Sequence, residues 1–137
     1  MLKRDYLVKQ VEEFGKVLAV ILGLKRNGLF PDMLEEISKA SQKYTSLEIL
    51  YIEKQENAGL IKDLTEDKKL NDEQMKLLAD LLFEKAEHYM YTEGAGAASD
   101  NAYRKAYIIY LFLKENATIN YSLDMHYKLE LLAKMGL

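Results

Sequence analysis

Apolar residues recur at intervals of three and four along most of the chain, and this spacing is typical of α-helices that bury one face. The first such helix is predicted over residues 4–24, which are followed by a turn at Asn27 and Gly28. Its buried stripe comprises Leu7, Val11, Phe14, Leu18 and Ile21, and is widened by Val8, Val17 and Leu22. We therefore expect the chain to open with one long amphipathic helix.

A second helix is predicted to begin at Pro31 or Asp32, because proline is favoured in the first turn of a helix. Its buried side comprises Leu34, Ile37, Ala40 and Tyr44. Beyond it the sequence leaves two possibilities open. Either Thr45 and Ser46 cap a third segment, or the second helix continues through them with a kink. Residues 60–70 are charged and irregular, with room for one short helix.

Three further helices are predicted after residue 70, each beginning at a polar residue that can cap it. Asn71 and Gln74 have the spacing of a capping box for the first of them. The second begins at Ser99 or Asp100, and Ser122 caps the third. Their apolar positions are, in order, Met75, Leu78, Leu82 and Tyr89; Ala102, Tyr103, Ala106, Ile109, Tyr110 and Leu113; and Leu123, Tyr127, Leu131 and Met135.

These elements predict an all-α fold of five to six antiparallel helices in a single compact array. Residues 94–98 are a predicted loop and residues 116–121 a connector, and short connections of this kind join antiparallel neighbours. The chain has one proline and lacks segments of alternating polar and apolar residues, so we predict no β-sheet. Because 137 residues fit one domain, we assign residues 1–137 to a single domain, with N-terminal helices in residues 1–59 and a second group in residues 71–137.

Small and aromatic residues in the second group carry a resemblance to a known repeat. Ala106, Tyr110 and Leu113 follow one another at intervals of four and three, after Ala102 and Tyr103. In this respect residues 71–137 resemble a tetratricopeptide-type helical hairpin, with the last helix as the packing partner from the next repeat. The opening of the chain is also similar to a family of small uncharacterised bacterial helical proteins with a repeat-like C-terminal half. These resemblances imply a fold and no activity.

Composition narrows the possible chemistry. The chain has no cysteine, which excludes disulfides, cysteine-containing zinc sites, iron–sulfur clusters and thiol catalysis, and is compatible with a reducing compartment. The formal charge is −3 with bases interleaved among acids, which disfavours nucleic acid as a partner. The apolar run at residues 17–24 is far short of the roughly 20 residues that span a bilayer. We therefore expect a cytoplasmic protein with no integral membrane segment.

Catalytic and metal-binding motifs are missing from the sequence, so we predict no catalytic, metal or cofactor residues. His88 lies one helical turn after Glu84, but Lys85 occupies the position that a Glu-x-x-His di-iron motif requires. We interpret Glu84 and His88 as an ion pair or a partly buried histidine. An alternative, an enzyme or small-ligand-binding protein, would build a pocket between the C-terminal helices from Tyr89, His88, Tyr107 and His126.

Tyrosine is abundant, with ten copies against no tryptophan. Because tyrosine combines apolar area with a polar tip, it is enriched at protein interfaces. Tyr89, Tyr103 and Tyr107 are therefore a candidate interaction surface that would line a groove for a peptide or a partner helix. The other interpretation is that these tyrosines belong to the core and rim of the helical array, with Tyr110 in the core in either case.

The first helix offers a second candidate surface, formed by Leu7, Val11, Phe14 and Leu18. This stripe either packs inside the domain or joins two copies of the chain as a homodimer. Peripheral membrane binding is opposed by the acidic residues of the same helix. Taken together, the sequence predicts a non-catalytic helical protein-interaction module with an unknown protein or peptide partner.

Overall fold

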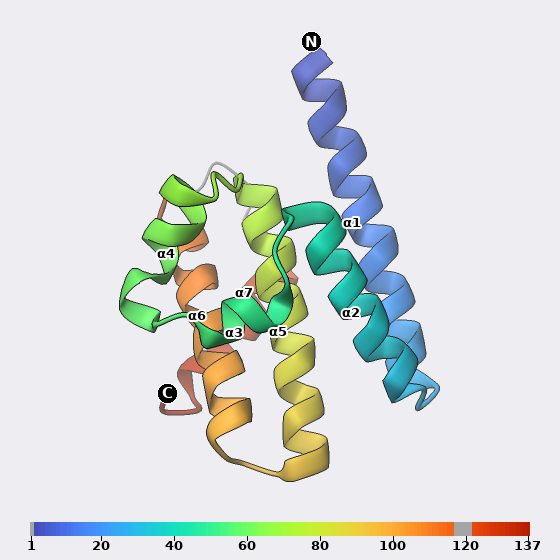
Figure 1. The fold of residues 1–137 in the computed structure, drawn as a ribbon, viewed down its shortest axis with the longest axis vertical. Coiled ribbons are helices and arrows are strands. Elements are labelled where there is room, and N and C mark those ends of the chain that lie inside the picture. Colours follow the sequence, from blue (N-terminus) through green and yellow to red (C-terminus); the bar gives the residue numbers. More distant parts are fainter. Residues whose placement is uncertain (1, 117–121) are drawn as a thin grey trace.

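The computed structural model describes residues 2–116 and 122–137, and the regular elements in them are all helical (Figure 1). The α-helices are α1 (Leu2–Arg26), α2 (Phe30–Thr45), α3 (Ile49–Lys54), α4 (Leu60–Lys62), α5 (Asp72–Glu93), α6 (Ala97–Asn116) and α7 (Leu123–Ala133). A 3₁₀ turn at Asn57–Gly59 and a π-helical turn at Asp63–Asp67 flank α4. The predicted all-α class is confirmed. These residues form more helices than the predicted five to six, because the separate third segment and the short helix within residues 60–70 both form, as α3 and α4.

The break after α2 settles the choice between a kinked helix and a separate segment. Ser46 adopts a left-handed conformation with φ 61° and donates its backbone N–H to the Gln42 carbonyl, which ends α2. The Ser41 hydroxyl donates to the Leu47 carbonyl at 2.6 Å and so fixes the chain beyond the break. A separate α3 follows. Its N-cap position is Glu48, whose side chain makes no capping hydrogen bond, rather than Thr45 or Ser46.

The predicted caps form at α5 and α7, whereas the predicted cap of α6 at Ser99 or Asp100 is wrong, because both residues lie inside that helix. The Gln74 backbone N–H donates to Asn71 Oδ1 and the Asn71 backbone N–H donates to Gln74 Oε1, both at 2.8 Å. The Met125 N–H donates to the Ser122 hydroxyl at 3.1 Å. Between α5 and α6, Gly94 adopts a positive φ and the connection is shorter than predicted, because α6 already begins at Ala97. Residues 117–121 of the predicted connector lie outside the described residues.

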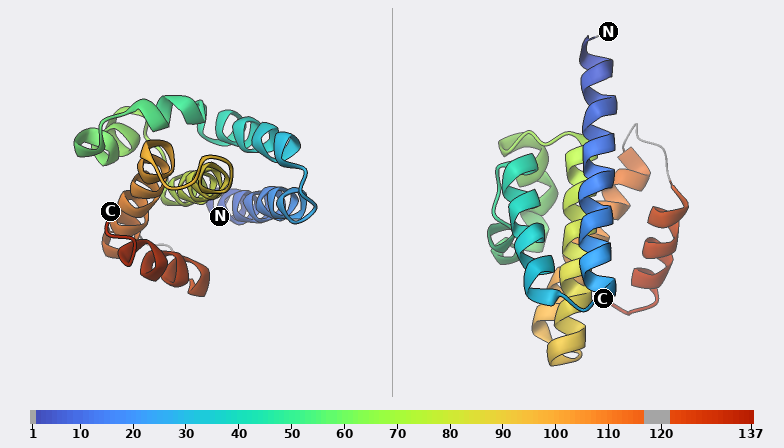
Figure 2. Two further views of the ribbon diagram at one scale, coloured as in Figure 1. Left: turned by 90° about the horizontal axis from the view of Figure 1, so that it is seen from below. Right: turned by 90° about the vertical axis from the view of Figure 1, so that its right-hand side faces the viewer.

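Helix α5 runs through the middle of the array. Figure 2 shows α1 and α2 on one side of α5, and α6 and α7 on the other. α6 returns antiparallel to α5 and is its most extensive contact. Residues 77–86 of α5 are all buried. Since ten consecutive residues cover every side of a helix, neighbouring elements enclose this part of α5 all round, where the sequence predicted one buried stripe.

The predicted apolar face of α6 is correct, whereas that of α7 is wrong. The buried residues of α6 include Ala102, Ala106, Ile109, Tyr110 and Leu113. In α7, the exposed fractions of Leu123 and Tyr127 are 86% and 64%, while Met125, Leu129 and Leu132 are buried. The predicted set, with Leu131 and Met135, is spaced by intervals of four, and the buried set by intervals of four and three. Both spacings keep residues near one side of a helix, so periodicity alone does not distinguish them. α6 covers the second set.

One buried acid of α5 ties three parts of the structure together. Asp80 is 1% exposed and accepts a short hydrogen bond from the Tyr110 hydroxyl of α6. Its carboxylate also pairs with Lys76 Nζ at 2.9 Å and with Lys128 Nζ of α7 at 3.3 Å. Burial, and then the Asp80 charge, raise the pKa of Tyr110 well above its ordinary value. The hydroxyl therefore stays protonated and acts as the donor.

The opposite side of α5 has its own polar network. Lys85 Nζ pairs with Glu53 of α3 at 2.7 Å. The Asn101 side-chain amide of α6 donates to the Glu53 carbonyl at 2.8 Å, and its oxygen accepts from Lys105 Nζ at 2.9 Å. Lys105 Nζ also donates to Asn57 Oδ1 at 2.7 Å. Burial lowers the pKa of Lys105. These contacts hold the short turns at residues 49–59 against the two long helices.

Substitution of Asp80 tests whether the buried charge stabilises the fold. Asp80→Asn keeps the shape of the side chain but removes the buried carboxylate that Lys76 and Lys128 share, and leaves Lys128 only its pair with the exposed Asp124. We therefore expect the free energy of unfolding to fall by about 3 kcal/mol. Urea denaturation at neutral pH measures it. The matched control is Glu35→Gln, which breaks the exposed pair that Glu35 forms with Lys39 at the same i,i+4 spacing and should change nothing measurable. Equal effects of the two substitutions would contradict the role of Asp80.

Candidate functional site

Helix α1 stands at the edge of the array, and its N-terminal end extends past the other helices (Figures 1 and 2). One side of α1 is held in the core by Phe14 and Ile21, which are 5% and 0% exposed. The Phe14 ring meets Tyr44 of α2 edge-on, with ring centroids 4.9 Å apart. Gln10 is also buried, and its Oε1 accepts from the Asn71 amide at 3.2 Å. The helix is therefore fixed in its rotation about its own axis.

A second side of α1 carries apolar residues that are exposed, apart from Leu18, which packs partly against the core. We call it the α1 face, and it consists of Val8, Val11, Gly15, Leu18 and Leu22. Intervals of three and four place these residues in one line on a helix. The exposed fractions of Val8, Val11 and Leu22 are 51%, 46% and 41%, and Leu18 is half-buried. A contiguous exposed apolar face of this kind is a candidate interaction surface.

A hollow opens beside the middle of the α1 face. It has a volume of about 180 Å³, and its lining includes Val11, Gly15 and Leu18 from α1 and Leu77 and Asp80 from α5. A Cβ atom added at Gly15 would meet nothing within 4 Å. The missing side chain therefore leaves a notch in the α1 face that this chain does not fill.

The C-terminal end of α1 is fastened to α5 by a partly buried ion pair. Lys25 Nζ lies 2.9 Å from Glu84 Oε1 and makes a shorter contact with Glu87. Burial raises the pKa of Glu84, and Lys25 offsets part of this increase. Burial lowers the pKa of Lys25, but hydrogen bonds to Glu87 and Glu84 outweigh it and raise the pKa overall. Lys25 therefore remains a cation, which suits an anchor and disfavours an amine nucleophile.

An aromatic pocket of about 320 Å³ adjoins this ion pair. Its Phe30 ring lies 5.4 Å from His88 and 5.1 Å from Tyr91, measured between ring centroids. Glu84, which the sequence had paired with His88, is bonded to Lys25 instead. The buried Nδ1 atom of His88 makes no hydrogen bond. Among residues 2–116 and 122–137, no three or more histidine, aspartate and glutamate side chains are grouped so as to hold a metal ion.

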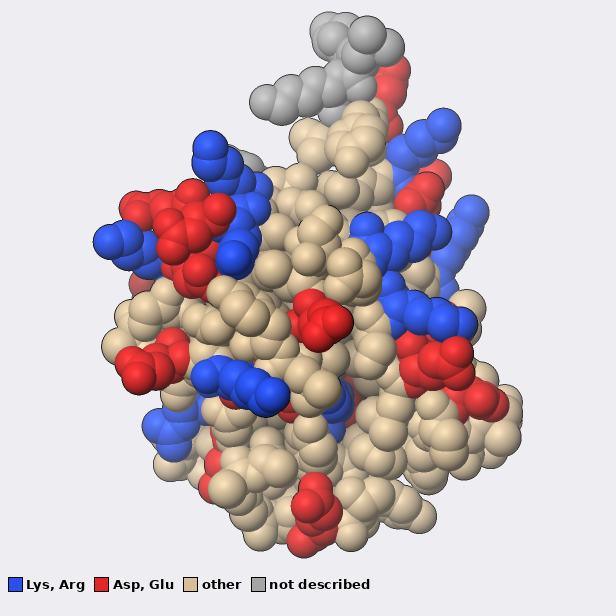
Figure 3. All heavy atoms as spheres, in the orientation of Figure 1, with Lys and Arg blue, Asp and Glu red and all other residues tan. Residues whose placement is uncertain are grey.

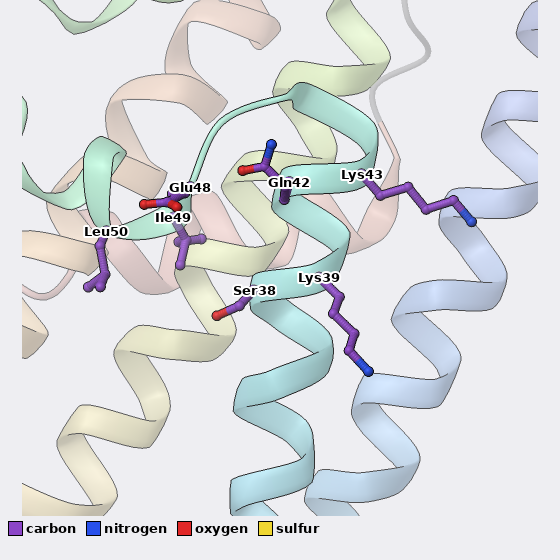
Figure 4. A pocket seen from close by; sticks show the side chains of 7 residues that line it. All are labelled: Ser38, Lys39, Gln42, Lys43, Glu48, Ile49 and Leu50. Carbon is purple, nitrogen blue, oxygen red and sulfur yellow. The ribbon is translucent and has the colours of Figure 1, made fainter.

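A wide hollow of about 700 Å³ lies between α2 and α3. Figure 4 shows that Lys39 and Lys43 extend toward α1, away from Glu48 and Leu50 at the other end of the hollow. Its polar groups do not converge on one point, as they would in a ligand site. On the face seen in Figure 3, small clusters of acidic and of basic side chains lie next to one another, and uncharged surface separates them.

The structure separates the three tyrosines of the predicted interaction surface. Tyr103 is 4% exposed, and its ring meets Phe83 edge-on at 5.7 Å between centroids. Tyr89 lies on the α3 side of α5, where its hydroxyl donates to Glu53 at 2.8 Å. Burial and this carboxylate raise its pKa. Tyr107 is half-buried and lines a hollow of about 230 Å³ between α6 and α7. These tyrosines do not line a single groove.

The alternative pocket is likewise only partly assembled. Of its four residues, Tyr107 and His126 line the α6–α7 hollow, which also includes Glu130. His126 Nε2 pairs with Glu130 at 2.9 Å. His88 faces the aromatic pocket beside α1, and Tyr89 bonds to α3. The residues predicted to converge therefore lie at three different places around α5 and α6.

The predicted dimer stripe on the first helix contains both buried and exposed residues. Phe14 is buried, Leu7 and Leu18 are half-buried, and Val11 is exposed. The exposed line is rotated from this stripe toward Val8, Gly15 and Leu22, which the predicted surface did not include. The sequence signal for this exposed line was the width of the apolar side of the helix. Val8 and Leu22 widen that side beyond the part that Phe14 buries. The sequence does not tell which edge of such a wide apolar side other helices cover.

Comparison of the chain with protein-family profiles, with curated proteins and with solved structures finds no match. None of the described helices is long and apolar enough to cross a membrane. The function must therefore be argued from the geometry of the chain.

Removal of Lys25 makes stability depend on pH in a defined direction. Without this cation the pKa of Glu84 rises further in the folded state. A carboxyl whose folded pKa exceeds its unfolded value destabilises the fold increasingly as the pH rises through that interval. Lys25→Met should therefore cost about 2 kcal/mol at pH 8, between the values for exposed and buried pairs, and clearly less at pH 5.

Urea unfolding of Lys25→Met and of the wild type at both pH values measures this difference. Lys16→Met is the control, since Lys16 is an exposed lysine of the same helix, and it should show no such dependence. A loss for Lys25→Met that is the same at pH 5 and pH 8 would show that Glu84 does not depend on Lys25.

Proposed function

We propose that this chain is a non-catalytic helical protein-interaction module and that it binds its partner through the α1 face. The observation that carries the proposal is the line of exposed apolar residues from Val8 to Leu22 on a helix at the edge of the array. Leaving such residues in water is unfavourable by about 25 cal/mol for each Å² of apolar area. A bound protein would remove this cost.

The way α1 is held supports the same proposal. Phe14 and Ile21 anchor it in the core, and Lys25 ties its last turn to Glu84. A helix that is already fixed loses little conformational entropy when a partner binds, so more of the contact energy becomes affinity. The hollow beside Gly15 adds a concave element to the surface, into which a partner side chain can insert.

In this proposal the C-terminal half is a degenerate tetratricopeptide-like unit that supports α1 rather than binding the partner itself. The antiparallel packing of α5 and α6, with the fully buried small residues Ala102 and Ala106, favours that assignment. The departure is length, since α5 and α6 together extend from residue 72 to residue 116, whereas the repeat has about 34 residues. We place the protein in the cytoplasm, in keeping with the absence of cysteine.

A small-ligand-binding protein is the second candidate, and the α6–α7 hollow with Tyr107 and His126 favours it. Its volume of about 230 Å³ lies below the roughly 300–1,000 Å³ of typical ligand pockets. The aromatic pocket beside α1 reaches only the lower end of that range, at about 320 Å³. The hollow of about 700 Å³ between α2 and α3 lies inside that range, but its polar groups do not converge. We therefore rank ligand binding below protein interaction.

Site-specific photo-crosslinking tests the proposal on two valines of the same helix. Val11 and Val20 have similar exposed fractions, 46% and 52%, but nine residues correspond to about two and a half turns, so they lie on opposite sides of α1. With benzoylphenylalanine at position 11 of the full chain, expressed in the native host, we expect a discrete protein adduct. Benzoylphenylalanine at position 20 should give none. Equal yields at both positions, or no adduct at either, would contradict binding through the α1 face.

A further inference from the structure

The α1 face has properties that identify its occupant. We propose that the α1 face binds the α1 face of a second copy of this chain, with the two helices antiparallel. The proposal rests on the proposed function and names the partner for that same surface. The argument for a second copy comes from the spacing of the apolar residues and the notch at Gly15, and the direction of the pair comes from the helix dipoles.

The spacing of the face is that of a helix pair. Val8, Val11, Gly15, Leu18 and Leu22 alternate in steps of three and four, which is the a/d pattern of two helices packed along their length. The pattern continues along the exposed side of α1, whereas Phe14 and Ile21, on the neighbouring side, are buried in the chain's own core. One helix of this chain therefore presents two faces, one for its own fold and one for a second helix.

The α1 face carries both a side chain that can insert into a partner, Leu18, and the notch at Gly15 that can receive it. In an antiparallel pair centred between residues 15 and 18, Leu18 of each copy lies opposite the notch at Gly15 of the other. In the same register, Val11 lies opposite Leu22. The hollow of about 180 Å³ beside Gly15 gives the incoming leucine room to insert. A surface that carries both its knob and the matching notch is complementary to itself, as a two-fold symmetric contact requires.

The helix dipoles favour one direction of the pair. In an antiparallel pair the positive N-terminus of one helix adjoins the negative C-terminus of the other, whereas a parallel pair places like ends together. The charged side chains at the two ends do not distinguish the directions, because Arg4 accompanies Asp5 at the start of the helix and Arg26 lies at its end. The direction therefore follows from the dipoles and from the register that places Leu18 opposite Gly15.

The contact area sets the expected affinity. The α1 face extends over 15 residues, from Val8 to Leu22, or roughly 22 Å at 1.5 Å per residue. One such helix pair is small against the roughly 800 Å² per partner of a standard stable interface. We therefore expect a reversible dimer with a Kd on the order of micromolar, which dissociates on dilution.

Sedimentation velocity of the purified full-length chain over a range of concentrations measures the dimer. Val11→Glu should raise the Kd at least tenfold, whereas the matched control Val20→Glu should leave it unchanged. Gly15→Gln should also raise the Kd at least tenfold, because it fills the notch, while the monomer tolerates it since nothing lies within 4 Å of an added Cβ. Circular dichroism checks that each variant remains folded. A Kd that is the same in Val11→Glu and Val20→Glu would overturn the proposal.

Orientation is read from disulfide formation, which is simple here because the chain has no cysteine of its own. The variants Val11→Cys and Leu22→Cys are mixed and oxidised. We expect the mixed 11–22 disulfide to exceed both symmetric disulfides. A predominant 11–11 disulfide would show a parallel pair and overturn the proposal.

A wild-type chain that stays monomeric at several hundred micromolar would also overturn it. In that case a photo-adduct of residue 11 with a different protein would still support the proposed function. The absence of any adduct would contradict both the proposed function and the proposed dimer.

Discussion

Asp80, Glu84 and Lys85 place three charges within about two turns of the most enclosed helix of the chain, and the arrangement of the other helices depends on neutralising them. Each charge has a partner on another element: α7 supplies Lys128 for Asp80, α1 supplies Lys25 for Glu84, and α3 supplies Glu53 for Lys85. Asp80 also pairs with Lys76 of α5 itself. A buried charge without a partner costs several kcal/mol. We infer that these pairs select one arrangement among those that apolar burial alone would allow.

The candidate binding surface follows from this constraint. Because Lys25 must reach Glu84 at the end of α1, while Phe14 enters the core in the middle of that helix, the rotation of α1 about its axis is set at two points. With that rotation, Val11 and Leu22 remain exposed in the line that we assign to a partner. The exposure of the α1 face is therefore a consequence of the contacts that Lys25 and Phe14 make in the interior.

Local features were predictable from sequence, and contacts between helices were not. The capping box of Asn71 and Gln74 depends on residues three apart, and it formed as expected. The buried side of α7 was assigned wrongly, because Leu123 and Met125 belong to equally periodic sets and only the position of α6 distinguishes them. The predicted dimer stripe failed to separate core from surface at Phe14 for the same reason. Periodicity defines the faces of a helix, while the neighbours decide which face is covered.

A double-mutant cycle between Lys25 and Glu84 tests most directly whether buried charge fixes the position of α1. The free energies of unfolding in urea are measured at neutral pH for the wild type, Lys25→Met, Glu84→Gln and the double variant. We predict a coupling energy of about 1–3 kcal/mol, as for residues that form one ion-pair network. Additive effects, with a coupling below about 0.3 kcal/mol, would show that α1 is held by apolar contacts alone and would contradict this account.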